Sequence, residues 1–154
     1  TMGDMPQFWA WALEQNSEFG GLPPPARGLA LPVSHSRADL THDPADVARS
    51  DPRGNTTIAV VATNAVLDKA SAKRLAVMAQ DGLARAIRPV HTPQDGDTVF
   101  AIATGKCRLG DDPFALAELG TLAADCLARA VARGVYHAAT LGGARGWRDV
   151  FGRG

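Results

Sequence analysis

Gly54-Asn55-Thr56-Thr57-Ile58-Ala59-Val60-Val61-Ala62-Thr63 is the stretch that decides the fold, because it leads from a turn directly into an apolar, β-branched run. Gly-Asn favours a turn, and the continuous apolar run after it predicts a buried strand over 58–63. The same stretch places a threonine hydroxyl at the entrance of the strand. A simple turn entering a strand has this composition too, so a role for the threonine depends on the rest of the sequence.

A second apolar run begins directly after two acidic residues. It reads His91-Thr92-Pro93-Gln94-Asp95-Gly96-Asp97-Thr98-Val99-Phe100-Ala101-Ile102-Ala103-Thr104, and it predicts a strand over 98–104. Asp95 and Asp97 flank a glycine at the mouth of this strand. A solvated Asp-Gly turn is one interpretation of the pair. The other is that both carboxylates belong to a site built around the first stretch.

After each predicted strand, apolar residues recur at helical spacing. Asp68 is predicted to cap a helix through Ile87, whose apolar face comprises Ala72, Leu75, Ala79, Leu83 and Ala86. Asp112 and Pro113 predict the start of a second helix, with apolar positions Leu116, Leu119, Ala123, Cys126, Leu127, Ala130 and Val131. The order strand, helix, strand, helix predicts a layered α/β fold.

The texture of the chain changes at about residue 55. Residues 20–54 contain a proline run and little periodicity, which predicts an extended linker. Before this linker lies a cluster of four aromatic residues and one leucine: Phe8, Trp9, Trp11, Leu13 and Phe19. These side chains are expected to pack on the core, or alternatively to line a substrate cleft or a subunit contact. The glycine-rich stretch 142–147 is expected to be a flexible terminus.

Composition excludes several classes of function. The chain has 154 residues, the size of one ordinary domain, and a formal net charge of zero. Zero charge gives no electrostatic case for nucleic-acid or membrane binding. No stretch approaches the roughly 20 apolar residues that span a bilayer, and no charged-then-apolar leader opens the sequence. We therefore expect a cytoplasmic protein.

Metal-ligating residues show no ligand spacing. Cys107 and Cys126 favour a reducing compartment with buried or inert thiols. The histidines are scattered over positions His35, His42, His91 and His137, and only His91 lies near the acidic pair. We expect neither a metal nor a cofactor.

Together, residues 54–63, 70–87 and 95–104 resemble the C-terminal part of the DmpA-type aminopeptidase family. These N-terminal nucleophile hydrolases include β-aminopeptidases and the nylon oligomer hydrolase. The likeness is to the nylon oligomer hydrolase branch, in which Gly-Asn-Thr-Thr at the processing site and Asp-Gly-Asp-Thr before a strand occur with similar separation. The resemblance covers most of residues 50–105. It implies a four-layer αββα sandwich, to which this C-terminal portion contributes strands of the inner sheets.

The resemblance also implies a mechanism. The precursor would cut itself between Asn55 and Thr56, so that residues 1–55 end the first (alpha) subunit and residues 56–154 form the nucleophile (beta) subunit. The new N-terminal Thr56 would attack substrate amides, with its own amine or a neighbouring group as the base. Asp95 and Asp97 match the acidic residues that hold the nucleophile's hydroxyl and amine.

The family's lysine or tyrosine and its oxyanion-stabilising asparagine have no matching positions here, and only residues 1–55 precede Thr56. We therefore expect an upstream alpha-subunit segment to supply them, a homo-oligomer of cleaved protomers as the active species, and no activity from this chain alone. The expected substrate is a small peptide, β-peptide or synthetic amide. Two alternatives remain: an acyltransferase of the ornithine acetyltransferase type, and a non-catalytic fragment that completes a partner's sheet.

Overall fold

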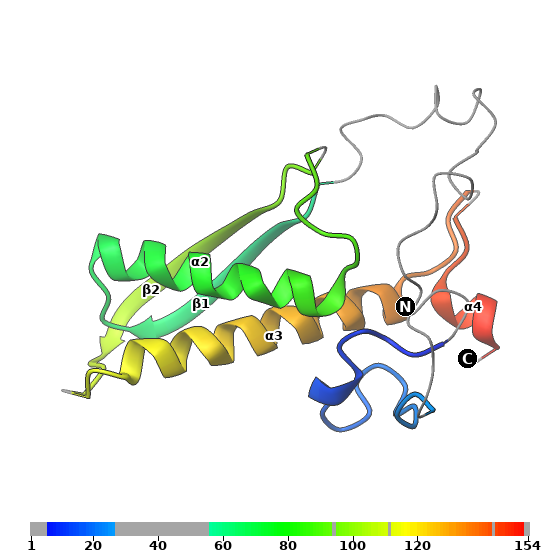
Figure 1. The fold of residues 1–154 in the computed structure, drawn as a ribbon, viewed down its shortest axis with the longest axis horizontal. Helices are drawn as coiled ribbons and strands as arrows, with labels where there is room; N and C mark the ends of the chain where they lie inside the picture. Colours follow the sequence, from blue (N-terminus) through cyan, green and yellow to red (C-terminus); the bar gives the residue numbers. More distant parts are fainter. Residues whose placement is uncertain (1–5, 27–55, 94, 111, 143, 153–154) are drawn as a thin grey trace.

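The structure, a computed structural model, describes residues 6–26, 56–93, 95–110, 112–142 and 144–152. Within these ranges the elements are the 3-10 helix η1 (Trp11–Leu13), strand β1 (Ile58–Ala65), helix α2 (Lys69–Ala86), strand β2 (Thr98–Cys107), helix α3 (Ala115–His137) and helix α4 (Trp147–Phe151). Helices α2 and α3 lie along the two strands (Figure 1). The predicted alternation of strand and helix is confirmed, and the fold is mixed α/β. The four-layer sandwich stays a prediction.

Strands β1 and β2 form a parallel two-stranded sheet in which Ile58 pairs with Thr98 and Val60 with Phe100. Parallel strands need a crossover connection, and α2 provides it. Both strands therefore begin at the same end of the sheet, beside the carboxyl end of α2 (Figure 1). The main-chain N–H of Thr98 donates to the carbonyl of Thr57 at 2.9 Å, so the pairing extends one residue before β1. This end of the sheet brings together the two segments singled out in the sequence.

The sequence predicts the N-cap of α2 correctly but not that of α3. Asp68 caps α2 as predicted, because its carboxylate accepts a hydrogen bond from the Ser71 N–H at 2.7 Å. The predicted cap of α3 is wrong, because that helix begins at Ala115 with Phe114 at its N-cap. Asp112 instead accepts from the Phe114 N–H at 2.8 Å and closes the turn that precedes the helix.

Helices α2 and α3 cross closely, and glycine makes the approach possible. The buried residues of α2 are Leu75, Ala79, Gly82 and Leu83, which matches the centre of its predicted apolar face. A Cβ atom on Gly82 would collide with the main-chain carbonyl oxygen of Ala124 on α3. On the opposite helix, a Cβ on Gly120 would collide with the side chain of Met78. Gly82 tolerates a side chain less well than Gly120, because the main-chain carbonyl of Ala124 cannot rotate away whereas the flexible side chain of Met78 can.

The aromatic residues near the two ends of the described chain pack together on α3. Phe8, Phe19 and Trp147 are at most 4% exposed and form one cluster with Ala128 and Ala132 of α3. The rings of Phe8 and Trp147 are stacked with centroids 5.3 Å apart. Core packing is thus confirmed for Phe8 and Phe19. The prediction of a flexible terminus is wrong for Trp147, which is buried at the start of α4.

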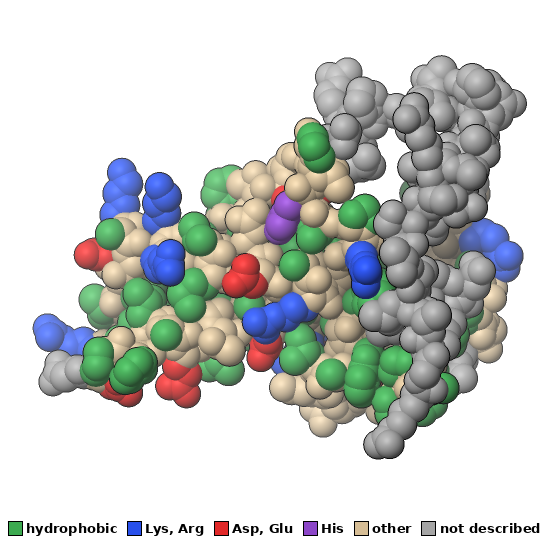
Figure 2. Space-filling view, viewed as in Figure 1, with side chains coloured by type: hydrophobic (Ala, Val, Ile, Leu, Met, Phe, Trp, Pro, Cys, Tyr) green, Lys and Arg blue, Asp and Glu red, His purple; other side chains and the backbone are tan. Residues whose placement is uncertain are grey.

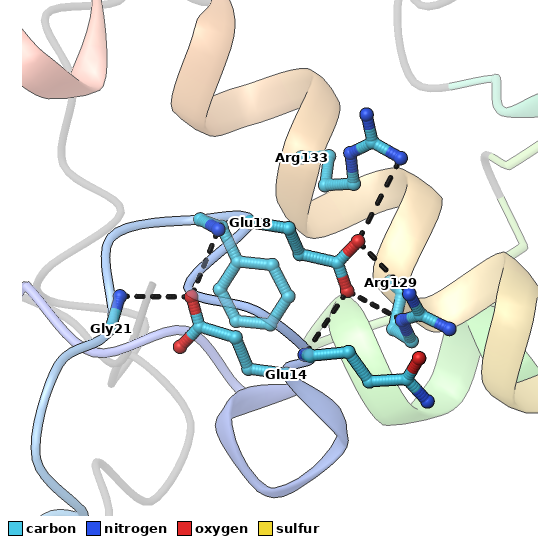
Figure 3. A network of polar contacts seen from close by, with 7 residues as sticks. Glu14, Glu18, Gly21, Arg129 and Arg133 are labelled. Carbon is cyan, nitrogen blue, oxygen red and sulfur yellow. Dashed lines mark hydrogen bonds and ion pairs between the residues drawn. The ribbon is translucent and has the colours of Figure 1, made fainter.

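An ion-pair network fixes the first described segment to the same helix (Figure 3). Arg129 donates to both carboxylate oxygens of Glu18, with Nη2 3.0 Å from Oε2, and Arg133 lies 3.7 Å from that oxygen. The hydrogen bond from Arg129 holds the pKa of Glu18 below its ordinary value, against the opposing effect of burial. Glu14 closes the segment on itself by accepting from the N–H groups of Phe19 and Gly21, each at 2.9 Å. Residues 14–21 are therefore held against α3 by charge and by packing.

The two faces of the sheet differ. Side chains at odd positions of β1 are partly buried on the helix side, whereas those at even positions are exposed. Four large apolar residues lie on the exposed face: Ile58 (71% exposed), Val60 (56%), Phe100 (55%) and Ile102 (53%). On the face shown in Figure 2, by contrast, apolar side chains over α2 and α3 lie among charged side chains of both signs. An apolar sheet face of this kind is typical of a surface that another layer covers.

The structure also bears on membrane insertion and on the two cysteines. No helix within the described ranges has the length and apolar character needed to cross a membrane. Cys107 and Cys126 are both free and exposed, so these two thiols are not buried.

Replacing Gly82 by Ala is expected to destabilise the protein by about 1–3 kcal/mol, because the added methyl group forces α2 away from the Ala124 carbonyl. Gly134→Ala is the matched control, since Gly134 is also helical but a Cβ there meets nothing within 4 Å. That change is expected to stabilise the helix by about 0.5–1 kcal/mol. Denaturant unfolding measures both, and equal effects would contradict the close crossing.

Candidate active site

The candidate site lies at the amino ends of the two parallel strands. Thr56 and Thr57 lead into β1, and Asp97 leads into β2. Between Asp97 and Asp95 lies Gly96, where an added Cβ would stand 2.7 Å from the Thr56 hydroxyl oxygen. The Thr56 side chain therefore rests against the Gly96 backbone, and only glycine gives it this room.

An open pocket of about 440 Å³ surrounds this point. Its lining comprises Thr56, Thr57, Ile87, Pro89, Val90, Thr92, Asp95 and Asp97. The structure thus brings the three predicted site residues, Thr56, Asp95 and Asp97, to one pocket from segments about 40 positions apart. Thr56 is exposed there. Its predicted cleavage partner, Asn55, lies outside the described residues.

Asp97 is the most constrained of the three residues. Its side chain is 5% exposed, and Oδ1 accepts a hydrogen bond from the Thr57 N–H at 2.9 Å. Oδ2 lies 2.9 Å from Nδ1 of His91, but the approach lacks hydrogen-bond geometry, so the two side chains are in close polar contact without a hydrogen bond. Burial raises the pKa of Asp97, yet the interactions with Thr57 and His91 outweigh it and hold this pKa below its ordinary value. A buried carboxylate that stays ionised is not a solvated turn residue.

Asp95 makes local contacts. Its Oδ2 accepts from the Thr92 N–H at 2.6 Å, and its own N–H donates to the Thr92 carbonyl at 2.9 Å. These reciprocal bonds close the loop from Thr92 to Asp95, which lies before the Asp-Gly step. Asp95 also lines the pocket, so its predicted role beside Thr56 stays a prediction.

Two residues of this site are not predicted by the sequence. Thr57 supplies the N–H that Asp97 binds, and its only sequence signal is its place directly before the strand. His91 lies near the acidic pair in the sequence, but its contact with Asp97 is evident only in the structure. Its backbone φ of 56° lies in the left-handed region, which a non-glycine residue seldom adopts. Among the described residues, no group of three or more His, Cys, Asp or Glu side chains converges as metal ligands would.

Asp97→Asn is expected to make the free energy of unfolding less dependent on pH. Because the folded-state pKa of Asp97 lies below its ordinary value of 3.8, the carboxylate contributes stability that is complete above 3.8 and lost as the pH falls through the lower, folded-state value. Denaturant unfolding should therefore show a larger deficit of the variant at about pH 6 than at about pH 2.5. A deficit of the same size at both pH values would contradict the ionised, hydrogen-bonded carboxylate.

Known proteins with similar sequences identify the family of this chain. The model of Peptidase family S58 matches residues 14–148. An uncharacterized aminopeptidase of Mycobacterium tuberculosis is 40% identical over 151 residues, covering 92% of this chain and 42% of the relative. An uncharacterized aminopeptidase of Mycobacterium leprae is 52% identical over 99 residues, covering 58% of this chain and 27% of the relative. A 6-aminohexanoate-oligomer endohydrolase of Paenarthrobacter ureafaciens is 37% identical over 60 residues, covering 39% of this chain and 17% of the relative.

The chain spans less than half the length of these relatives. The family match nevertheless extends over most of the chain, from the Glu14 network to α4. It confirms the resemblance to the DmpA-type aminopeptidases and the nylon oligomer hydrolase branch. The chain belongs to Peptidase family S58.

Proposed function

We propose that this chain carries the nucleophile of a self-processing amide hydrolase and that Thr56 is that nucleophile. The observation that carries the proposal is the convergence of Thr56, Asp95 and Asp97 on one pocket at the amino ends of β1 and β2. Membership of a peptidase family supports hydrolysis of amide bonds. The name of one relative, an oligomer endohydrolase, supports it too.

Turnover starts with a free amine on Thr56. The amine takes the proton of the Thr56 hydroxyl as the oxygen attacks the amide carbonyl, and a tetrahedral intermediate forms. Collapse of the intermediate breaks the C–N bond, and the leaving amine receives the proton. The acyl group remains on Thr56 as an ester. Water, deprotonated by the same amine, then attacks the ester and releases the carboxylic acid, which restores the enzyme.

Asp97 orients the nucleophile in this scheme. Its Oδ1 holds the N–H of Thr57, the residue bonded to Thr56, and so fixes the main chain that carries the reacting hydroxyl and amine. Its negative charge also favours the ammonium that forms when the amine takes a proton. Asp95 closes the loop beside it and adds a second carboxylate to the pocket.

Maturation uses the same hydroxyl. The Thr56 oxygen attacks the Asn55 carbonyl, the peptide bond rearranges to an ester, and water hydrolyses that ester to leave a free amine on Thr56. Residues 1–55 then end the alpha subunit, and residues 56–154 form the beta subunit. A single nucleophile therefore serves both self-cleavage and turnover.

The rest of the enzyme comes from outside these residues. An upstream segment supplies the lysine or tyrosine and the asparagine of the oxyanion hole, which stabilises the tetrahedral intermediate. Its strands form a second sheet that covers the apolar face of β1 and β2, completing the four-layer αββα sandwich. Cleaved protomers then assemble into a homo-oligomer. The scarcity of cysteine favours a cytoplasmic location.

The substrate is a small amide: a peptide, a β-peptide or a synthetic amide. The pocket lining combines the apolar residues Ile87, Pro89 and Val90 with threonines and carboxylates. This combination suits an apolar chain that ends in an amide. The hydrolase names of the relatives favour hydrolysis over the acyltransferase alternative and over a purely structural fragment.

Thr56→Ala in the full-length precursor is expected to abolish both chain cleavage and amide hydrolysis, because both require the same hydroxyl. Thr56→Ser keeps a hydroxyl and should keep part of each activity. Thr121→Ala, which removes an exposed threonine from α3, is the control and should change neither. Gel analysis and release of amine from a short amide measure the outcomes. A Thr56→Ala precursor that still splits before residue 56 would refute the self-cleavage.

Phe100→Asp in the full-length protein is expected to prevent assembly, because it places a charge on the sheet face that the second sheet covers. Val77→Asp is the matched control, since Val77 is also exposed, at 47%, but lies on α2. Light scattering and co-purification of the two cleaved subunits measure assembly. Normal assembly of Phe100→Asp would refute the covered face.

A further inference from the structure

We propose that His91 is a positioning residue for the Thr56 nucleophile and acts on it through Asp97. The proposal rests on the proposed function of Thr56. It goes beyond that function because His91 neither reacts nor belongs to the residues that line the pocket.

The backbone of His91 is held in an unusual conformation. Its φ of 56° is left-handed, which costs a non-glycine residue energy and persists only where the surroundings enforce it. On one side the loop is fixed by the bonds between Thr92 and Asp95. This conformation aims the imidazole at Asp97, with Nδ1 2.9 Å from Oδ2.

Asp97 thus joins His91 to the main chain of the nucleophile. Oδ1 binds the Thr57 N–H, and among the described residues Oδ2 faces His91 without a hydrogen-bond donor of its own. The His91 side chain is 35% exposed and that of Asp97 only 5%, so the imidazole reaches solvent while the carboxylate does not. Removing the imidazole frees Oδ2 and opens Asp97 to water. The carboxylate can then rotate away from Thr57 and release the segment that carries Thr56.

Kinetics distinguish this role from substrate binding. Because His91 does not line the pocket, its loss should leave KM nearly unchanged and lower kcat, as expected when a nucleophile is misplaced. In the full-length enzyme we expect His91→Ala to lower kcat by about tenfold to a hundredfold, on the scale of a misplacement of about 1 Å, with KM changing less than about threefold. Self-cleavage of the precursor should slow by a similar factor, because it uses the same hydroxyl.

His91→Asn is the conservative variant. The side-chain amide of asparagine places an N–H group as many bonds from Cα as Nδ1 of histidine, so it can occupy the same place beside Oδ2 of Asp97, and asparagine tolerates the left-handed backbone. We expect it to restore kcat and self-cleavage to within about threefold of the wild type. His137→Ala, at the exposed end of α3, is the matched control and should behave as the wild type. Thermal unfolding of each variant accompanies the kinetics.

The outcomes separate the two proposals. A wild-type kcat and cleavage rate in His91→Ala would overturn the role of His91 and leave that of Thr56 intact. An equal loss in His91→Ala and His91→Asn, with unfolding temperatures unchanged, would overturn positioning through the contact between Nδ1 and Oδ2. A rise in KM with kcat unchanged would show that His91 binds substrate instead. Activity that survives in Thr56→Ala would instead refute the proposed function itself.

Discussion

The parallel pairing of β1 and β2 is the constraint on which the rest of the site depends. Ile58 pairs with Thr98, and the hydrogen bond from the Thr98 N–H to the Thr57 carbonyl continues the pairing one residue before β1. This register sets Thr57 beside Asp97 and Thr56 against Gly96. A slip by one residue would turn every side chain to the opposite face and would part Asp97 from the Thr57 N–H. The geometry of the site is therefore a consequence of strand register.

The helices keep this small sheet in place. A two-stranded sheet is marginal by itself and needs packing on at least one face. Helix α2 connects the strands and crosses α3 closely at Gly82. The carboxyl-terminal half of α3 is stabilised by the Glu18–Arg129 ion pair and by the stacked rings of Phe8 and Trp147. These contacts stabilise one face of the sheet only. The other face presents Val60 and Phe100 to solvent, and a second layer that covers it would remove these apolar side chains from water.

Much of this arrangement could be predicted because it is local. The β-branched run of β1, the Asp68 cap and the apolar spacing of α2 each depend on residues a few positions apart. That Thr56 and Asp97 lie at one pocket could be expected because the Gly-Asn-Thr-Thr and Asp-Gly-Asp-Thr motifs both resemble those of the family. Features that depend on distant contacts were missed. Trp147 is ordered by Phe8, far away in the sequence, and the left-handed turn at His91 is stabilised by loop contacts that no periodicity encodes. The start of α3 was misplaced because Asp112 caps a turn instead of the helix.

The central claim is that Thr56 is the nucleophile and carries a free amine. Trapping the acyl-enzyme tests it most directly: the full-length enzyme reacts with a slowly hydrolysed activated ester, and peptide mapping by mass spectrometry locates the acyl group. We expect the acyl group on a peptide whose first residue is Thr56. An acyl group on another residue, such as the exposed thiol of Cys126, or on a peptide in which Asn55 is still bonded to Thr56, would contradict it.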